Sequence, residues 1–240
     1  MPESELKQWG EKDFSNRYLD IADIMVIGRK RSLKTLQSFY RQFLKNKKPN
    51  TILDLGCGDG VITNALLSID DSISATLIDG SEEMLNKARK RFSGIENFKY
   101  INSVFQDLMK SDIDLGEFDL VVSSLAIHHL ANEQKKALFK YIHFHLKTGG
   151  HFFNIDVVRS QSEAIEKWHI ELWKEGFKEQ LPPDEMKSVF EEMVSTYTEK
   201  EHYSNVDTLE TQIEGLKEAG FQNVDCFFKR GMFAIYGGCK

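Results

Sequence analysis

The stretch ILDLGCGDG, Ile52 to Gly60, decides the fold, because an apolar run is followed at once by three closely spaced glycines. Short, branched, apolar runs of this kind are typical of strands buried on both faces of a parallel sheet. The next nine residues, VITNALLSI, are apolar enough to form a packed helix. Gly56, Gly58 and Gly60 therefore lie at a strand-to-helix turn, where the backbone can adopt positive φ and approach a ligand closely.

The spacing of these glycines differs from two standard phosphate-binding signatures. It is G-x-G-x-G, whereas the dinucleotide fingerprint is G-x-G-x-x-G with its last glycine inside the helix. No Lys followed by Ser or Thr comes after Gly60, so the turn is not a P-loop either. The turn predicts a nucleotide or cofactor site of another kind.

Strand-like and helix-like segments alternate through the rest of the chain. Strands are predicted at 75–79, 98–101, 118–124, 151–158, 223–230 and 232–240, and helices at 61–69, 81–92, near 107, at 132–146 and at 207–221. Ser81 favours a helix start, and Gly220 favours a helix end. Strands separated by helices of this length predict right-handed crossovers and a parallel sheet.

The pattern over residues 50–156 resembles the class I S-adenosylmethionine (SAM) dependent methyltransferases. DLGCGDG resembles their first motif, and ATLIDGS, INSVFQDL, FDLVVSSLAIHHL and LKTGGHFFNID follow in the order of that family. The resemblance implies an α/β fold with a doubly wound, mostly parallel seven-stranded sheet. Its strand order is 3-2-1-4-5-7-6, with the last strand antiparallel and helices on both faces. It also implies SAM as cofactor, S-adenosylhomocysteine (SAH) as product, and methyl transfer as the activity.

The resemblance also implies roles for particular residues. Asp54 neighbours the methionine end of SAM, Asp79 takes the ribose hydroxyls, and Asp107 lies near the adenine. Two of them have an alternative: Asp54 as a turn acid, and Asp107 as a surface acid with Gln106 as the adenine partner. The full expected cofactor set is Asp54, Gly56, Cys57, Gly58, Asp79, Gly80, Asp107, Leu108, Ser124 and Leu125. Cys57 reads either as a reactive thiol or, as we favour, as a small residue that fits the loop.

Two adjacent histidines follow the fourth predicted strand, beside the transferable methyl group in this family. A histidine has an unperturbed pKa near 6.5 and can accept a proton from an ammonium, phenol or other hydroxyl. We favour His129 over His128 as general base, from the L-H-[ILV] pattern of small-molecule methyltransferases that this segment resembles. The alternative is that both histidines pack against or cap the helix that starts near Asn132, since many methyltransferases use no base.

Two additions flank the family pattern. Residues 1–48 are predicted to form an N-terminal helical cap on a methyltransferase domain at 49–240, and a helical insertion at about 159–205 follows the fifth strand. Ligands lie outside the carboxyl ends of the strands in such sheets, so we expect both additions to cover the substrate. The residues singled out for substrate or lid contact are Tyr18, Arg29, Trp168 and Trp173. For the tryptophans, plain helix packing is the alternative.

Composition limits the partners. The chain has 240 residues, a formal net charge of −6 and three cysteines without C-x-x-C spacing. The cysteines suit a reducing cytoplasm, and no histidine spacing indicates a metal site. No segment has the pattern of a membrane span or a signal peptide. The acidic total disfavours nucleic-acid binding, but the acid-free basic stretch from Arg29 to Lys48 keeps an RNA contact open.

Three functions follow from these observations. The first is a SAM-dependent methyltransferase of a small molecule, located in the cytoplasm. The second is an RNA-modification enzyme or a carboxy-SAM synthase-like enzyme, which resembles this chain in having an N-terminal helical cap and a helical insertion. The third is a SAM-binding regulatory protein without catalysis. The sequence leaves the methyl acceptor and the oligomeric state open, and a homodimer is compatible with it.

Overall fold

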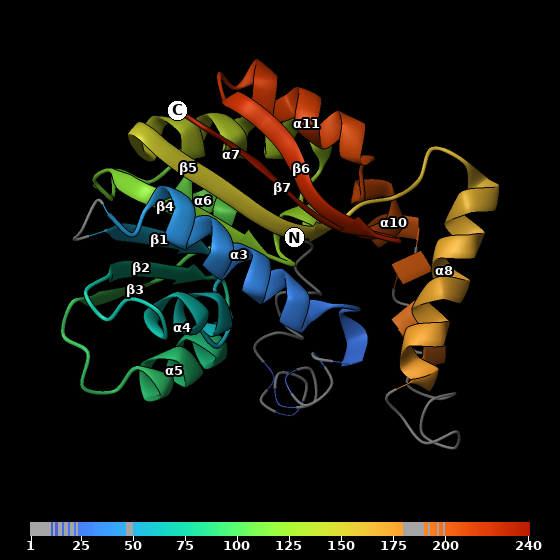
Figure 1. Cartoon of the computed structure of the whole chain (residues 1–240), viewed down its shortest axis with the longest axis horizontal. Helices are drawn as coiled ribbons and strands as arrows, with labels where there is room; N and C mark the ends of the chain where they lie inside the picture. The colour runs from blue at the N-terminus through green and yellow to red at the C-terminus, as the bar shows by residue number, and fades with distance from the viewer. Residues whose placement is uncertain are drawn as a thin grey trace.

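A computed structural model describes residues 11, 13, 16, 19, 22, 24–46, 50–179, 190–191, 193–195, 197–198 and 200–240. Figure 1 shows a central sheet with helices on both faces. Its seven strands run in the order β3-β2-β1-β4-β5-β7-β6, which confirms the predicted order. Within the described ranges, no helix is both long and apolar enough to cross a membrane.

The sheet is parallel except at one strand. The parallel strands are β1 (Thr51–Leu55), β2 (Ser74–Asp79), β3 (Phe98–Asn102), β4 (Phe118–Ser124) and β5 (Leu146–Val157). The last strand, β7 (Phe233–Cys239), runs antiparallel between β5 and β6 (Gln222–Arg230), as predicted. The glycine turn therefore leaves the sheet at β1, next to the point where the strand order reverses between β1 and β4.

One boundary differs from the prediction. Strand β5 begins at Leu146, directly after the preceding helix, whereas residues 146–150 were expected to precede the strand. The backbone of Gly149 donates to the carbonyl of Lys240 at 2.9 Å, and the Lys240 N–H donates to the carbonyl of Gly150 at 3.0 Å. The end of the chain thus supplies partners that extend the strand through its two glycines, which a local sequence pattern cannot reveal.

Two hydrophobic cores lie on opposite faces of the sheet. The first face is covered by α3 (Arg29–Phe43), α4 (Val61–Leu67) and α5 (Glu82–Arg91), and the second by α6 (Phe105–Leu108), α7 (Asn132–His145) and α11 (Leu209–Glu218) (Figure 1). The predicted start of α5 is confirmed, because the Ser81 side chain accepts the backbone N–H of Met84 at 3.3 Å. Helix α3 shares the first core with the sheet through Leu36 and Tyr40.

The predicted insertion after β5 contains α8 (Glu163–Lys178) and α10 (Lys200–Asn205). A third hydrophobic cluster joins it to the body of the protein, with Trp173 and Phe177 of α8 against Val26, Ile27 and Phe233. The Trp173 indole N–H donates to the carbonyl of Met25 at 2.7 Å. The predicted helix break at Pro182–Pro183 lies outside the described residues.

Candidate functional site

A cleft opens at the carboxyl ends of β1, β2 and β4. It contains about 970 Å³ of empty space, part of which is open solvent. Five groups of residues line it: Gly56–Asp59 with Val61 and Ile62; Asp79–Ser81 with Met84; Ser103–Gln106; Ser124–Ala126 with His129 and Leu130; and Leu19 with Arg29. The cleft thus collects the ends of several consecutive strands at the position where open α/β sheets bind ligands.

The glycine turn has the predicted conformation. Gly56 has φ +67° and Gly58 has φ +55°, both in the left-handed region that side chains disfavour. A Cβ on Gly56 would lie 2.4 Å from the Cβ of Ala126, so this glycine lets the turn approach the end of β4. A Cβ on Gly58 would meet only the end of Met84, at 3.8 Å. The backbone at Gly58 is therefore exposed to the cleft.

Asp79 fixes the shape of this turn from the next strand. Its two carboxylate oxygens accept the backbone N–H groups of Gly58 and Ser81, each at 2.8 Å. Burial raises the pKa of Asp79, although both of these hydrogen bonds act to lower it. Each carboxylate oxygen has a second lone pair, so the side chain can still accept hydrogen bonds from a ligand in the cleft.

Asp54 lies behind the cleft lining, with a side chain that is almost fully buried. The hydroxyl of Thr63 donates to its Oδ2 at 2.6 Å, while its Oδ1 has no hydrogen-bond partner among the described residues. Burial raises the pKa of Asp54 to about 7, against the lowering effect of the Thr63 hydrogen bonds. A buried acceptor without a donor is costly, so this oxygen fits a ligand that brings a positive charge and N–H groups.

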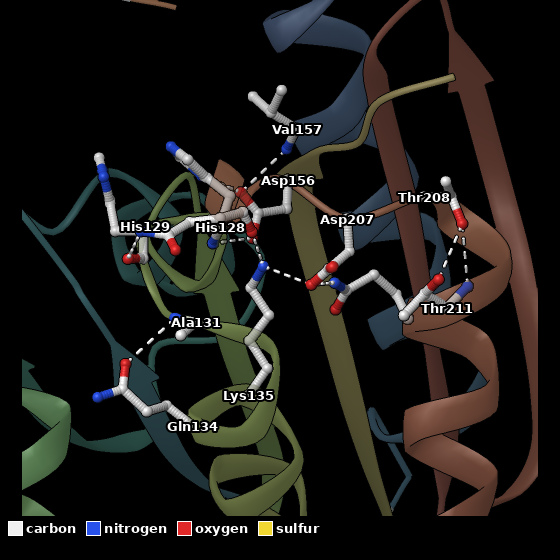
Figure 2. A network of polar contacts seen from close by, with 12 residues as sticks. His128, His129, Ala131, Gln134, Lys135, Asp156, Val157, Asp207, Thr208 and Thr211 are labelled. Atoms are coloured by element: carbon white, nitrogen blue, oxygen red, sulfur yellow. Dashed lines mark hydrogen bonds and ion pairs between the residues drawn. The ribbon is translucent and has the colours of Figure 1, made fainter. Parts of the chain in front are cut away.

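The two histidines after β4 lie side by side but have different surroundings (Figure 2). His129 lines the cleft, whereas His128 is buried and its Nδ1 contacts Asp156 Oδ1 at 2.5 Å. Their rings stay close, with centroids 4.1 Å apart. Both belong to a short 3₁₀ helix, η1 (Ile127–His129), which precedes α7. Of the two, only His129 is placed to contact a ligand in the cleft.

The predicted cofactor set divides into two groups. Gly56, Cys57, Gly58, Asp79, Gly80, Ser124 and Leu125 line the cleft, and Arg29 of the predicted substrate set joins them. Asp54, Asp107 and Leu108 do not: Asp54 is buried behind the lining, Asp107 is exposed and Leu108 packs in the second core. Gln106, the alternative adenine partner, is the last residue of that segment in the lining.

The two predicted substrate tryptophans also lie away from the cleft. Trp168 has 59% of its surface exposed, and Trp173 packs in the third cluster. Five helical residues turn the chain by roughly 500°, so the two side chains leave different faces of α8. Tyr18, the remaining residue of that set, lies outside the described residues.

Cys57 behaves as the small buried residue that we favoured. Its thiol is buried, and burial raises its pKa well above the ordinary value, with further contributions from the charges of Asp79, Asp54 and Asp59. A thiol held neutral is a poor nucleophile.

Several lining residues were not predicted as site residues. Ser103, Val104 and Phe105 follow β3, and Ala126 follows β4. Their residue types carry no chemical signature, so only their position at the carboxyl end of a strand could have marked them as site residues. Asp156, the partner of His128, could have been found in the same way from its position at the end of β5.

Two other features bear on the site. In the part of the chain that the structure describes, no three His, Cys, Asp or Glu side chains gather to hold a metal ion. A separate shallow groove runs along α3, where Lys30, Arg31, Lys34 and Arg41 surround Phe39 and Phe43. This groove contains part of the basic stretch predicted from the sequence, whereas Arg29 of that stretch lines the cleft.

Comparison with known proteins gives matches over the same region. Residues 52–150 match the family model described as a methyltransferase domain. A carboxy-S-adenosyl-L-methionine synthase of Nautilia profundicola is 23% identical over 94% of this chain and 92% of its own length. An uncharacterised methyltransferase of Bacillus cytotoxicus is 30% identical over 60% of this chain and 66% of its own length.

The fold has solved relatives as well. An O-methyltransferase family protein from Burkholderia thailandensis superposes with a TM-score of 0.64 at 10% identity, over 97% of this chain. The present chain spans 61% of the length of that protein. At this identity the likeness concerns the fold alone.

Proposed function

The chain belongs to the class I SAM-dependent methyltransferases, and we propose that it transfers the methyl group of SAM to a small-molecule acceptor. The observation that supports this most is the buried acid Asp54 and the partly buried acid Asp79 around a positive-φ glycine turn that opens on a cleft containing His129. Membership of the family implies SAM as the cofactor, and the small-molecule acceptor is our proposal.

The residues present fit SAM. The buried Oδ1 of Asp54 suits the methionine ammonium, and the Asp79 carboxylate suits the ribose hydroxyls. Gln106 lies where the adenine is expected. Arg29 brings a positive charge to the lining, for the SAM carboxylate or for an anionic acceptor.

Chemistry at such a site depends on orientation. Bound SAM supplies a methyl group already activated on a sulfonium, so the protein contributes alignment and exclusion of water. In the proposed transfer, an acceptor lone pair would form the new bond to the methyl carbon as the carbon–sulfur bond breaks toward sulfur. His129, in the lining next to the end of β4, would take the proton that the acceptor loses.

Replacing Asp79 by Ala is expected to weaken SAM binding by roughly 1 to 3 kcal/mol. The loss has two sources: the ribose contacts, and the hydrogen bonds that hold Gly58 and Ser81 in place. Asp107→Ala is the matched control, because that carboxylate is exposed outside the cleft. Calorimetric titration of SAM into both variants measures the effect, and equal affinities for the two would remove Asp79 from the site.

The acceptor class is tested with SAM carrying a tritiated methyl group. The protein is incubated with three separate pools from cells: small metabolites, RNA and protein. We expect label in the small-metabolite pool and none in the other two. Label in RNA would replace the small-molecule proposal with RNA modification, and SAM binding without transfer to any pool would favour the regulatory alternative.

A carboxy-SAM synthase-like activity is the second candidate, because the similarity to such an enzyme extends over nearly the whole chain. The two proposals differ in the cofactor that the purified protein carries. Denaturation followed by mass spectrometry is expected to release SAM or SAH. Release of carboxy-SAM would establish the second candidate instead.

A further inference from the structure

We propose that Asp156 and Asn205 are positioning residues that hold His129 in the cleft, one from the sheet and one from the inserted helices. The inference rests on the proposed role of His129. Neither residue lines the cleft, and each acts on the backbone or the ring of the short helix η1 that carries His129.

Asp156 holds η1 from the end of β5. Its carboxylate is almost fully buried, and it accepts the backbone N–H of His128 at 3.0 Å together with the His128 ring Nδ1 at 2.5 Å (Figure 2). The Val157 N–H adds a third contact at 2.9 Å. Burial acts to raise the pKa of Asp156, but the charge and hydrogen bond of His128, with the Val157 N–H and Lys135, hold it below its usual value. The carboxylate is thus a charged acceptor at neutral pH.

Asn205 holds the same helix from the other side. It is the last residue of α10, and its side-chain amide donates to the carbonyl of His129 at 3.2 Å. The buried ammonium of Lys135 fixes Asn205 in turn, because it donates to the Asn205 carbonyl. It also donates to Asp207 Oδ2 at 2.7 Å (Figure 2). The end of the insertion is therefore tied directly to the residue that faces the ligand.

These bonds leave the His129 side chain little freedom of position. The backbone is held at the N–H of His128 and at the carbonyl of His129, which flank the Cα that carries the ring. The ring lies close to that of His128, which Asp156 orients. Just upstream, Leu125 has φ +53° and donates its N–H to the carbonyl of Ile155 at 2.8 Å. A non-glycine residue in this region is strained, so the surrounding contacts must impose the shape of the turn.

The network also gives the insertion a means of affecting catalysis. Asp207 accepts Gln212 at 3.1 Å, Gln212 accepts the Tyr236 hydroxyl at 3.3 Å, and Asn154 donates to that hydroxyl at 2.8 Å. The contacts thus return to β5, close to Asp156. Movement of the inserted helices would pull on Asn205 and shift His129, whereas the glycine turn and Asp79 lie outside these bonds.

The test uses the full chain labelled with ¹⁵N in its seven histidines. Ring spectra are recorded at one fixed pH, and His129→Gln identifies the signals of His129. Asp156→Asn is expected to shift the ring signals of both His128 and His129, and Asn205→Ala those of His129. Matched controls are Asp119→Asn and Asn97→Ala, whose side chains make hydrogen bonds elsewhere in the sheet. Both controls are expected to leave the two signals unchanged.

SAH titration accompanies the spectra, and we expect its affinity to be unchanged in both positioning variants. If Asp156→Asn fails to fold, Asn205→Ala decides the question. His129 signals that stay in place in a folded Asn205→Ala variant would overturn the proposal. Absence of SAH binding to the wild-type protein would instead contradict the proposed function, and the ring spectra would still measure positioning.

Discussion

Replacing Asp54 by Asn should make the cofactor-free protein more stable above pH 7, by up to about 4 kcal/mol, and should weaken SAM binding. Burial raises the Asp54 pKa from 3.8 to about 7 in the folded chain. Between about pH 4 and pH 7, the folded chain therefore keeps the Asp54 proton, whereas the unfolded chain has released it. The contribution of neutral Asp54 to folding stability is complete below about pH 4 and is lost as the pH rises through about 7. Asparagine has no charge to desolvate.

Urea unfolding of the wild type and the Asp54→Asn variant from pH 4.5 to pH 8 measures this difference. Asp119→Asn is a control for which we expect the opposite change in stability. Burial acts to raise the pKa of Asp119, but Lys147 and Thr51 hold that pKa below its usual value. Loss of that carboxylate should destabilise the protein at pH 7. SAM affinity of Asp54→Asn should fall by roughly 1.5 to 3 kcal/mol, the value of a hydrogen bond to a charged group. A variant that is no more stable at pH 8, with unchanged SAM affinity, would make Asp54 an ordinary turn acid.

His129→Ala should lower turnover by about a hundredfold or more while leaving SAM affinity unchanged. The ring lines the cleft at the end of β4 and has no place in the glycine turn that we assign to the cofactor. Removing it therefore removes the proton acceptor but not the binding site.

Single-turnover rates with a labelled acceptor separate this effect from binding. His143→Ala is the matched control, because His143 lies on α7 against Phe221, outside the cleft lining. If His129→Ala retained the wild-type rate with the same acceptor, the histidine would have a packing role and transfer would need no general base.

The sheet could be predicted because its signals are local. β1, β4 and the glycine turn follow from buried apolar runs and from residues that permit positive φ, and Ser81 marks the start of α5. Where partners come from distant segments, prediction was wrong. The early start of β5 depends on Phe118 of β4, which pairs with Leu146, and on Lys240, which bonds Gly149 and Gly150.

The site divides in the same way. Asp79 follows from its place at a strand end, and the structure adds that it holds Gly58 and Ser81. Gln106 lines the cleft and Asp107 does not, because neighbouring residues of a short helix face different sides, which the sequence pattern does not distinguish. The contact between Asn205 and His129 joins residues 76 apart and has no sequence signal. Aromatic content alone could not separate exposed Trp168 from buried Trp173.

We propose that this cleft binds SAM through Asp54, Asp79 and the glycine turn. Calorimetric titration of the wild-type protein with SAM, SAH and NAD tests this proposal. We expect one site per chain for SAM and for SAH, and no binding of NAD. Binding of NAD with no heat from SAM or SAH would contradict the cofactor assignment and every site residue that depends on it.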